Sequence, residues 1–310
     1  MNRIEIPKGN GKTRVIWVPT AWEKAVSRII QAELEERYAP HACVHGFVKG
    51  RSPVSNAAAH IGDWRFTLSM DIEAFFDNVR VDTAGKHLDI SVQEIAERSV
   101  RIFRRSFSAP EENFEFPGGR AVQGLPCSPI IANLAMDEAD TRILNLRNRS
   151  RFGWDFTYTR YADDLTFSYN HPNVGNRLLE NVQRIIAEYG FRINPNKTHI
   201  QTADVSRRHI TGIAVGKDGI YIPRALKRRL RAASHQAKNG MKPKTFARFE
   251  GNPYAQLDHL RGLKEWANLK EPKIESINLI PDPRIRSFTQ PSNTPRSRPA
   301  MPVFNRVISA

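Results

Sequence analysis

Cysteine is scarce in this sequence, which contains only Cys43 and Cys127 among its 310 residues. Two cysteines are too few for a disulfide framework, and no Cys/His spacing typical of a zinc site is present. A run of about eighteen apolar residues is also missing, so we expect no membrane-spanning helix. Residues 1–10 are polar and lack the apolar stretch that signal peptides carry. A reducing cytoplasm is therefore the expected location.

Acidic residues are the minority among the charged residues. The chain has 47 Lys and Arg against 32 Asp and Glu, a formal net charge of +15. This excess favours a polyanionic partner, either a nucleic acid or a membrane surface. Residues 223–248 concentrate it, with nine Lys or Arg and no acidic residue. The hydrophobic content of 40% is enough for a globular protein, and the length allows one core with lobes or more than one core.

Residues 156–169 are dominated by Thr, Tyr and Phe, which suit a pleated strand. Only Ala162-Asp163-Asp164 interrupts the run, which indicates a strand, a tight turn and a second strand. This hairpin carries two adjacent carboxylates at its tip. Because neighbouring aspartates repel each other, we expect a divalent cation to neutralise them. The alternative is a solvated Asp-Asp turn that binds nothing.

A third carboxylate comes from another part of the chain. Phe66 to Met70 predict a strand, and Asp71 stands at its C-terminal end. Two metal ions about 4 Å apart can activate an attacking hydroxyl and stabilise the leaving oxygen of a phosphoryl transfer. Carboxylate oxygens are the ligands that Mg²⁺ prefers. We therefore predict a site for two Mg²⁺ ions on Asp71, Asp163 and Asp164.

Four short motifs resemble those of reverse transcriptases and occur in that family's order. Tyr161-Ala162-Asp163-Asp164 is similar to the YxDD box, and Asp71 followed by the aromatic Phe76 resembles motif A. Residues 123–129, QGLPCSP, resemble the QGxPxSP loop that cradles the incoming nucleotide and template. Residues 190–198 resemble motif D. Four ordered motifs are a far more specific signal than one.

Two further motifs resemble those of bacterial retron reverse transcriptases. Asn56-Ala57-Ala58-Ala59-His60 is similar to their NAxxH motif, and it follows a finger-like segment at residues 46–52. Ile210-Thr211-Gly212 is similar to their VTG triplet, with Ile in place of Val. The resemblance covers roughly residues 10–270, and residues 281–310 form a Pro-rich tail that matches nothing. That tail is expected to be extended or disordered.

The resemblance implies an RNA-directed DNA polymerase that uses deoxynucleoside triphosphates. In a retron, the enzyme copies part of a cognate structured non-coding RNA (msr–msd) into branched, RNA-linked single-stranded DNA (msDNA). Priming from a guanosine 2′-hydroxyl, an effector protein, a role in anti-phage defence and no membrane partner are further implications. Two alternatives stay open: another stand-alone bacterial reverse transcriptase, similar to those of group II introns, and an RNA-binding scaffold of a defence complex.

The resemblance also implies roles for individual residues. Lys197 would be an acid or electrostatic aid to pyrophosphate departure, although it could be an ordinary surface lysine. Phe76 would lie against the sugar and exclude a 2′-hydroxyl. The expected nucleotide-binding residues are Arg14, Lys49, Arg51, Phe76, Gln123 and Gly124. The expected RNA-binding residues are Asn56, His60, Thr211, Gly212, Lys227, Arg228 and Arg231. For Asn56 and His60, bracing of the fingers is an equal alternative.

The expected fold class is α+β, a right-hand polymerase with fingers, a palm of antiparallel sheet backed by helices, and a helical thumb. Apolar spacing predicts a hairpin over 1–20 and helices over 22–38, 52–61, 89–107, 130–146 and 178–189. A basic helix is expected to begin near Pro223. The expected regions are fingers at 1–65, a palm strand at 66–80, an insertion at 81–129, the hairpin-bearing palm at 130–217, a basic thumb at 218–280 and the tail at 281–310.

Overall fold

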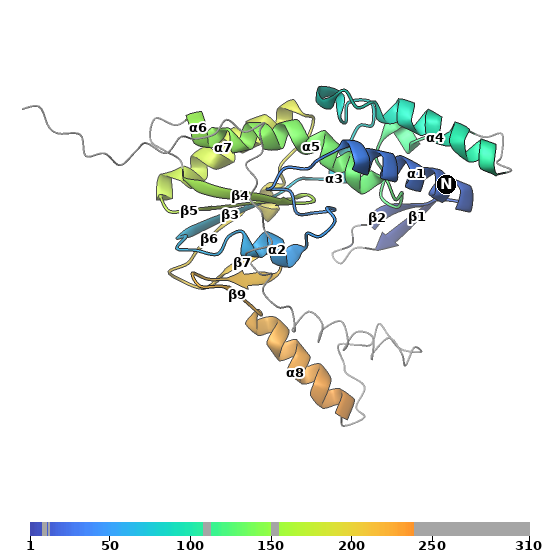
Figure 1. The fold of residues 1–310 in the computed structure, drawn as a ribbon. Coiled ribbons are helices and arrows are strands. Elements are labelled where there is room, and N and C mark those ends of the chain that lie inside the picture. Colours follow the sequence, from blue (N-terminus) through green and yellow to red (C-terminus); the bar gives the residue numbers. More distant parts are fainter. Residues whose placement is uncertain (8–10, 12, 108–112, 150–154, 239–310) are drawn as a thin grey trace, which may run out of the picture.

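The computed structural model describes residues 1–7, 11, 13–107, 113–149 and 155–238 (Figure 1). Most of the turn of the hairpin predicted over 1–20, the thumb beyond residue 238 and the tail at 281–310 lie outside this range. Within the described residues, no helix is long and apolar enough to cross a membrane. The predicted α+β class is confirmed, because antiparallel sheets and separate helices make up the fold.

A four-stranded antiparallel sheet with the order β4-β5-β3-β6 lies at the centre. Its strands are β3 (Phe66–Asp71), β4 (Phe156–Tyr161), β5 (Asp164–Tyr169) and β6 (His199–Thr202). The strand predicted at residues 66–70 and the predicted hairpin are both present. β5 is buried along its whole length after Asp164, because this sheet is covered on both faces. The predicted strand that bears Asp71 thus lies between two partners from much later in the chain.

Helices α5 (Ser128–Leu144) and α7 (Pro172–Glu188) cover one face of this sheet, the upper one in Figure 1. The short helix α2 (Pro53–Ala58) lies on the other face, next to a three-stranded sheet of β7 (Arg208–Ile210), β8 (Ile213–Val215) and β9 (Ile220–Tyr221). Leu68, Met70, Ile131, Leu165 and Ile186 belong to one continuous core under α5 and α7. A smaller core, including Ala57 and Val215, joins α2 to the second sheet.

The N-terminal region packs beside this centre. β1 (Asn2–Pro7) and β2 (Thr13–Val18) form the predicted hairpin, and α1 (Ala21–Arg37) packs along α4 (Val92–Ser106). Thr20 and Glu23 form a capping box that fixes where α1 begins. The shorter elements are α3 (Phe75–Asn78), α6 (Leu146–Arg149) and three single-turn helices, η1 (Lys86–Leu88), η2 (Pro117–Gly119) and η3 (Pro195–Lys197).

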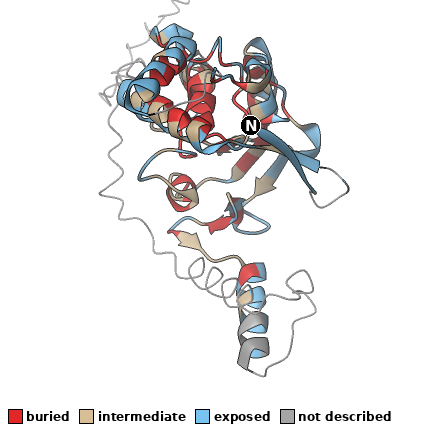
Figure 2. Ribbon diagram, turned by 90° about the vertical axis from the view of Figure 1, so that its right-hand side faces the viewer, coloured by how far each residue is buried: buried red, intermediate tan, exposed pale blue. Residues whose placement is uncertain are grey.

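The basic helix α8 (Arg224–Lys238) follows β9 and extends away from the rest of the fold (Figure 1). Figure 2 shows the contrast in burial: red, buried segments fill the layers around the central sheet, whereas the described part of α8 is mostly pale blue. Among the side chains of α8 that the structure describes, Leu226 is buried, whereas Lys227, Arg228 and Arg231 are exposed. The predicted helix near Pro223 is therefore present, and its charge faces solvent.

Two predicted helix boundaries were wrong. The helix expected over 52–61 ends at Ala58, so His60 lies in the turn that follows α2. The helix expected from Leu178 begins six residues earlier at Pro172, where His171 caps it by accepting a bond from Asn173 N. Its first turn contains Pro172, Asn173 and Gly175 and only one buried apolar side chain, Val174, which explains why apolar spacing alone starts the helix too late.

Candidate active site

Three carboxylates gather at one edge of the central sheet. Asp71 and Asp164 are opposite each other in the register of β3 and β5, and Asp163 precedes Asp164 in the hairpin turn. The amide of Ile72 donates to the carbonyl of Asp163 at 2.9 Å, which ties the end of β3 to that turn. The predicted triad of aspartates is therefore brought together by strand pairing between segments about ninety residues apart in the chain.

The charges of these carboxylates act on one another. Enclosure by the surrounding protein, followed by repulsion from Asp163 and Asp71, raises the pKa of Asp164 to about 6, although the residue is exposed toward a cavity. Burial, followed by the charge of Asp71, also raises the pKa of Asp163. The fold therefore holds negative charges together at a cost, which is typical of a site that receives a cation.

Lys197 supplies one positive charge at this edge. Its Nζ donates to Oδ2 of Asp71 at 2.8 Å, and this hydrogen bond raises the pKa of Lys197. The lysine arrives on η3, which is joined to β3 because the amide of Asn194 donates to the carbonyl of Asp71 at 2.8 Å. Lys197 is thus a protonated group beside the carboxylates, as its predicted role requires, and its side chain remains 61% exposed.

Two cavities meet at the carboxylates. The first has a volume of about 750 Å³ and lies toward β2, the Gln123 loop and α3. The second, of about 630 Å³, lies toward β6 and the β7–β8 turn. Asp71, Asp163 and Lys197 line both cavities, whereas Asp164 lines only the second. The carboxylate edge therefore stands between two spaces that could each hold a separate reactant.

Four of the six predicted nucleotide-binding residues line the first cavity: Arg14, Phe76, Gln123 and Gly124. Gly124 has φ +122°, and a Cβ built there would lie 1.9 Å from the carbonyl oxygen of Trp17. Only glycine allows this close approach. The amide of Trp17 also donates to the carbonyl of Gln123 at 2.8 Å, which fixes β2 against the loop.

Lys49 and Arg51 line neither cavity, and their contact with the nucleotide phosphates stays a prediction. Lys49 is exposed, and the Arg51 guanidinium donates to the backbone carbonyls of His41 and Val44. Arg51 follows those carbonyls by ten and seven residues in the chain, and its side chain folds back to bond to them. Its role in this structure is to brace the finger-like segment.

The NAxxH residues are buried. His60 is fully buried, with Nδ1 2.8 Å from Ser168 Oγ on β5 and Nε2 2.7 Å from Thr159 Oγ1 on β4. Burial, followed by the positive charge of Arg208, lowers the pKa of His60 to about 3. Of the two alternatives weighed for His60, this geometry is that of bracing, because the ring has no surface to offer an RNA. Asn56 is 1% exposed and lies 3.5 Å from the hydroxyl of Thr211.

The remaining predicted RNA-binding residues fall into two groups. Thr211 and Gly212 form the β7–β8 turn and line the second cavity beside the carboxylates. Lys227, Arg228 and Arg231 on α8 are exposed and line neither cavity. The structure thus places Thr211 and Gly212 beside the carboxylate edge, whereas the basic residues of α8 lie apart from it.

The donor set fits a divalent cation in its chemistry. Three carboxylates share one edge, all of their donors are oxygen atoms, and the pKa values of Asp163 and Asp164 are raised by burial and then by repulsion between the carboxylates. Over residues 1–107 and 113–238, as far as these are described, no three His, Cys, Asp or Glu side chains already converge as a metal cluster. The side chains are instead spread along the edge, with Lys197 bonded to one of them.

Sequence reasoning assigned no role to several residues that line the cavities, among them one aromatic residue and two histidines. Phe47 lies in the first cavity, and its ring centroid is 5.9 Å from that of Phe76. His199 and His209 lie in the second cavity. Phe47 could have been found, since it follows Gly46 within the finger-like motif. The histidines had no signal, because they stand on separate short strands, β6 and β7.

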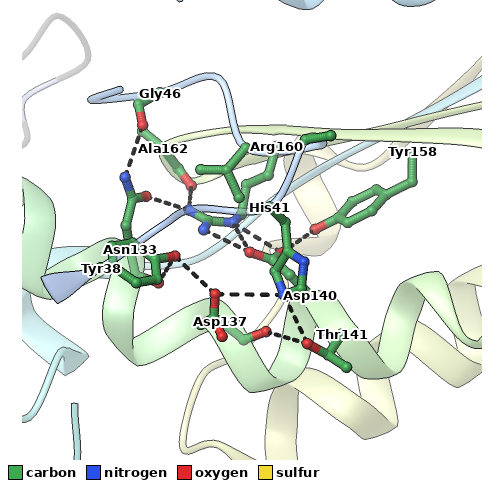
Figure 3. Close-up of polar contacts among 12 residues, drawn as sticks. Tyr38, His41, Gly46, Asn133, Asp137, Asp140, Thr141, Tyr158, Arg160 and Ala162 are labelled. Carbon is green, nitrogen blue, oxygen red and sulfur yellow. Dashed lines mark hydrogen bonds and ion pairs between the residues drawn. The ribbon is translucent and has the colours of Figure 1, made fainter. Parts of the chain in front are cut away.

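A buried polar network lies behind the carboxylate turn (Figure 3). Its centre is Arg160, which is fully buried and donates to Asp140 through Nε and Nη2, the latter at 2.7 Å. Tyr158 also donates to Asp140, at 2.7 Å. Tyr38 and His87 contact the neighbouring Asp137. Burying a guanidinium is tolerable only when its donors are satisfied, so the strand before the turn is held in one position.

Comparison with known proteins identifies relatives. Residues 6–238 match the family described as reverse transcriptase (RNA-dependent DNA polymerase). The chain is 34% identical to the retron Mx162 reverse transcriptase of Myxococcus xanthus, over 86% of this chain and 57% of that protein. It is 32% identical to the retron Mx65 reverse transcriptase of the same organism, over 86% of this chain and 61% of that protein.

Among solved structures, the chain is similar to telomerase from Candida albicans in complex with a fragment of telomeric RNA. That similarity has a TM-score of 0.48 and 14% identity, and it covers 86% of this chain and 52% of the telomerase chain. This chain spans about three-fifths of the length of the two Myxococcus relatives.

Proposed function

The chain belongs to the reverse transcriptase family, and from that premise we propose that it is an RNA-directed DNA polymerase of the retron type. The reaction is attack of a primer hydroxyl on the α-phosphate of a deoxynucleoside triphosphate, directed by an RNA template, with pyrophosphate leaving. The observation that carries this proposal is the position of Asp71, Asp163 and Lys197, which line both of the cavities that meet at the sheet edge. One cavity would take the nucleotide, and the other would take the primer end.

Reverse transcriptases use divalent metal ions, and we propose two Mg²⁺ ions here, held by Asp71, Asp163 and Asp164. The ions would lower the pKa of the attacking hydroxyl and stabilise charge on the leaving oxygen. The chain's own residues do the rest. The carboxylates give the site its negative charge, and Lys197, protonated beside Asp71, is placed to donate to the departing pyrophosphate.

The nucleotide cavity supports a division of work among its walls. Arg14 brings a cation to the side at which the triphosphate would enter. The backbone at Gln123 and Gly124, fixed against β2, would position the base and template. Phe76, half-buried and in contact with Phe75 and Phe47, presents a ring that would leave no room for a 2′-hydroxyl.

RNA binding is proposed for two places. Thr211 and Gly212 border the second cavity, close to where a primer or template strand would pass. The exposed face of α8, with Lys227, Arg228 and Arg231, offers a row of cations to a phosphate backbone. We propose that residues 1–65 contribute the fingers, 66–80 and 130–217 the palm, 81–129 an insertion shared by fingers and palm, and 218–280 the thumb.

The similarity to two retron enzymes supports a more specific proposal. The cognate RNA would be a structured msr–msd transcript, the product would be msDNA, and an effector protein of a defence system would be the partner. Sequencing the nucleic acid that co-purifies with the protein tests this. One abundant RNA joined to single-stranded DNA is expected, whereas a diverse RNA population without linked DNA would favour an RNA-binding scaffold or an intron-like enzyme.

The activity itself is tested by incorporation of deoxynucleotides on an RNA template with a primer. We expect incorporation that requires Mg²⁺ and stops when it is chelated. The matched control is the same reaction with the RNA template alone, from which both the primer and the cognate transcript are omitted. Incorporation that is absent in Mg²⁺ and Mn²⁺ on every RNA tried, including the co-purified RNA, would contradict the proposal.

A further inference from the structure

Asn133 on α5 bonds to two separate segments of the active site. The residue is 1% exposed. Its Oδ1 accepts from Nη1 of Arg160 at 3.0 Å, and its Nδ2 donates to the carbonyl of Gly46 at 3.0 Å (Figure 3). A buried amide with both ends satisfied has one orientation only. Asn133 therefore connects the two segments through one side chain, in addition to the backbone bonds between residues 43–46 and Arg160.

The first segment is the carboxylate turn. Nη1 of Arg160 also donates to the carbonyl of Ala162 at 3.2 Å. Ala162 has φ +57°, a left-handed conformation that costs a non-glycine residue free energy and must be held by its surroundings. The next residue is Asp163. The bond from Arg160 to Ala162 thus fixes the backbone that aims the carboxylate.

The second segment is the loop around Gly46. The amide of His45 donates to the carbonyl of Arg160 at 2.8 Å, and a Cβ added at Gly46 would lie 2.2 Å from the backbone nitrogen of Ala162. This loop therefore presses directly on the carboxylate turn. Phe47 is the next residue, and it forms a wall of the nucleotide cavity beside Phe76.

The helix that carries Asn133 contributes a third wall. α5 begins at Ser128, and Ser128 and Pro129 line the same cavity. They lie five and four residues before Asn133, about one helical turn away. Three parts of the cavity therefore meet on the first two turns of one helix: its own N-terminus, the Gly46–Phe47 loop and the Ala162–Asp163 turn.

We propose that Asn133 is a positioning residue that sets the distance between the Phe47 wall of the nucleotide cavity and the carboxylate turn. It acts through Gly46 and Arg160 and touches no substrate. The inference rests on the proposed function, because it takes the ligand of this cavity to be a deoxynucleoside triphosphate. Loss of the amide removes the bond between α5 and the carbonyl of Gly46, so the loop is held only by its backbone bonds to Arg160, while Asp140 still holds the Arg160 side chain.

The alternative is that Asn133 only stabilises the core. Tyr158→Phe is the matched control for that role. Tyr158 is 3% exposed and donates to the same Asp140 that binds Arg160, but no bond joins it to Gly46 or Ala162. Both changes remove buried hydrogen bonds from one network, and only the change at Asn133 removes a bond to the Gly46 loop.

The experiment compares Asn133→Ala, Asn133→Asp and Tyr158→Phe in steady-state incorporation and in Mn²⁺ binding without nucleotide. Asn133→Asp keeps the acceptor for Arg160 and loses the donor to Gly46, and it provides a second variant should the alanine fold poorly. For both Asn133 variants we expect KM for the deoxynucleotide to rise about tenfold, with Mn²⁺ affinity within about twofold of wild type. For Tyr158→Phe we expect KM within about twofold of wild type at a comparable melting temperature.

A rise of KM in Tyr158→Phe equal to that in the Asn133 variants would overturn the inference, as would unchanged KM in all three. Amide hydrogen exchange over residues 43–50 tests the same coupling without catalysis. Faster exchange in the Asn133 variants alone supports it, and equal exchange in all variants overturns it. If the wild-type protein incorporates no deoxynucleotide, the proposed function fails, and the exchange measurement still decides whether Asn133 holds the loop.

Discussion

The carboxylate edge and helix α8 are both regions of concentrated charge, but they are built in opposite ways. At the edge, Asp71 is 6% exposed and the strand behind the turn carries Arg160 with no exposed surface. On α8, Lys227, Arg228 and Arg231 all face solvent. Chemistry on a phosphate needs groups held within a fraction of an ångström, whereas attraction to a phosphate backbone needs only charge at the surface. The buried network is what such precision requires.

The largest expected effect is on catalysis by the carboxylate edge, with RNA binding left almost unchanged. Asp163→Asn with Asp164→Asn should lower deoxynucleotide incorporation by about a thousandfold or more, because the developing charge of the transition state loses its stabilisation. RNA affinity should stay within about twofold, since the two carboxylates are proposed to hold metal ions and not to contact the RNA. Mg²⁺-dependent incorporation and filter binding measure the two quantities.

The control for that variant is Asp204→Asn with Asp218→Asn, which removes the same charge from exposed positions. It should leave incorporation near the wild-type rate. Incorporation by the Asp163/Asp164 variant that stays close to wild type would remove the hairpin from the active site.

The reverse experiment changes Lys227, Arg228 and Arg231 to Ala. The slope of log affinity against log salt should flatten by about two to three units, and the affinity for cognate and non-cognate RNA should fall together. The rate at saturating RNA should be unchanged, because none of these side chains lines a cavity. Salt titrations of RNA binding provide the measurement.

Lys24→Ala with Arg177→Ala and Arg184→Ala removes an equal charge from exposed positions on α1 and α7. A matching loss of affinity in this control would mean that net charge acts rather than α8. A loss confined to cognate RNA would mean that α8 reads RNA shape or bases.

The buried region should also titrate in a way that the exposed helix does not. His60 has a pKa lowered to about 3 in the fold, against an ordinary value near 6.5. The unfolded chain binds the proton first, so the free energy of unfolding is complete above pH 6.5 and falls as the pH drops toward 3. Between pH 7 and pH 5 this one group should lower it by about 2 kcal/mol.

His60→Gln isolates this effect, because Gln keeps hydrogen-bonding capacity toward Ser168 and Thr159 without titrating. Its unfolding free energy, measured by urea titration at each pH, should depend less steeply on pH than that of the wild type. Arg208 and His45, which also face His60, are unchanged in the comparison. Equal pH dependence of the two proteins would contradict the prediction, and the α8 variant should retain the wild-type dependence.

The smallest expected effect concerns selectivity. Phe76→Val should raise ribonucleotide incorporation relative to deoxynucleotide incorporation by about tenfold, because a smaller side chain opens the space beside C2′; a contact of this size changes discrimination by about 1–3 kcal/mol. Competition between rNTP and dNTP on one template measures the ratio. Phe103→Val, on α4 and outside the cavity, is the control. An unchanged ratio would make Phe76 a core residue only.

The sequence was sufficient for the parts of the site that have local patterns. The hairpin was predicted from its run of β-forming residues, and the position of Asp71 was predicted because it ends a strand. The burial of Arg160 could not be predicted from the sequence. A charged residue between Tyr158 and Tyr161 has no periodic pattern, and its partner Asp140 lies on another element. Arg51 was expected at the nucleotide because of its motif position, and its bonds to the carbonyls of His41 and Val44 had no sequence signal. For His60, RNA contact and bracing were equal alternatives, and the hydroxyls that hold its ring come from β4 and β5, about a hundred residues later.

Strand β3 has a consequence for the synthesis of the protein. It ends at Asp71, whereas its neighbours in the sheet end at Tyr169 and Thr202. At about 5–20 residues per second, the ribosome needs on the order of ten seconds to deliver both. During that interval the nascent chain carries an apolar strand with two open edges and one carboxylate. Nascent chains on neighbouring ribosomes of one mRNA can pair through those open edges before the sheet is complete.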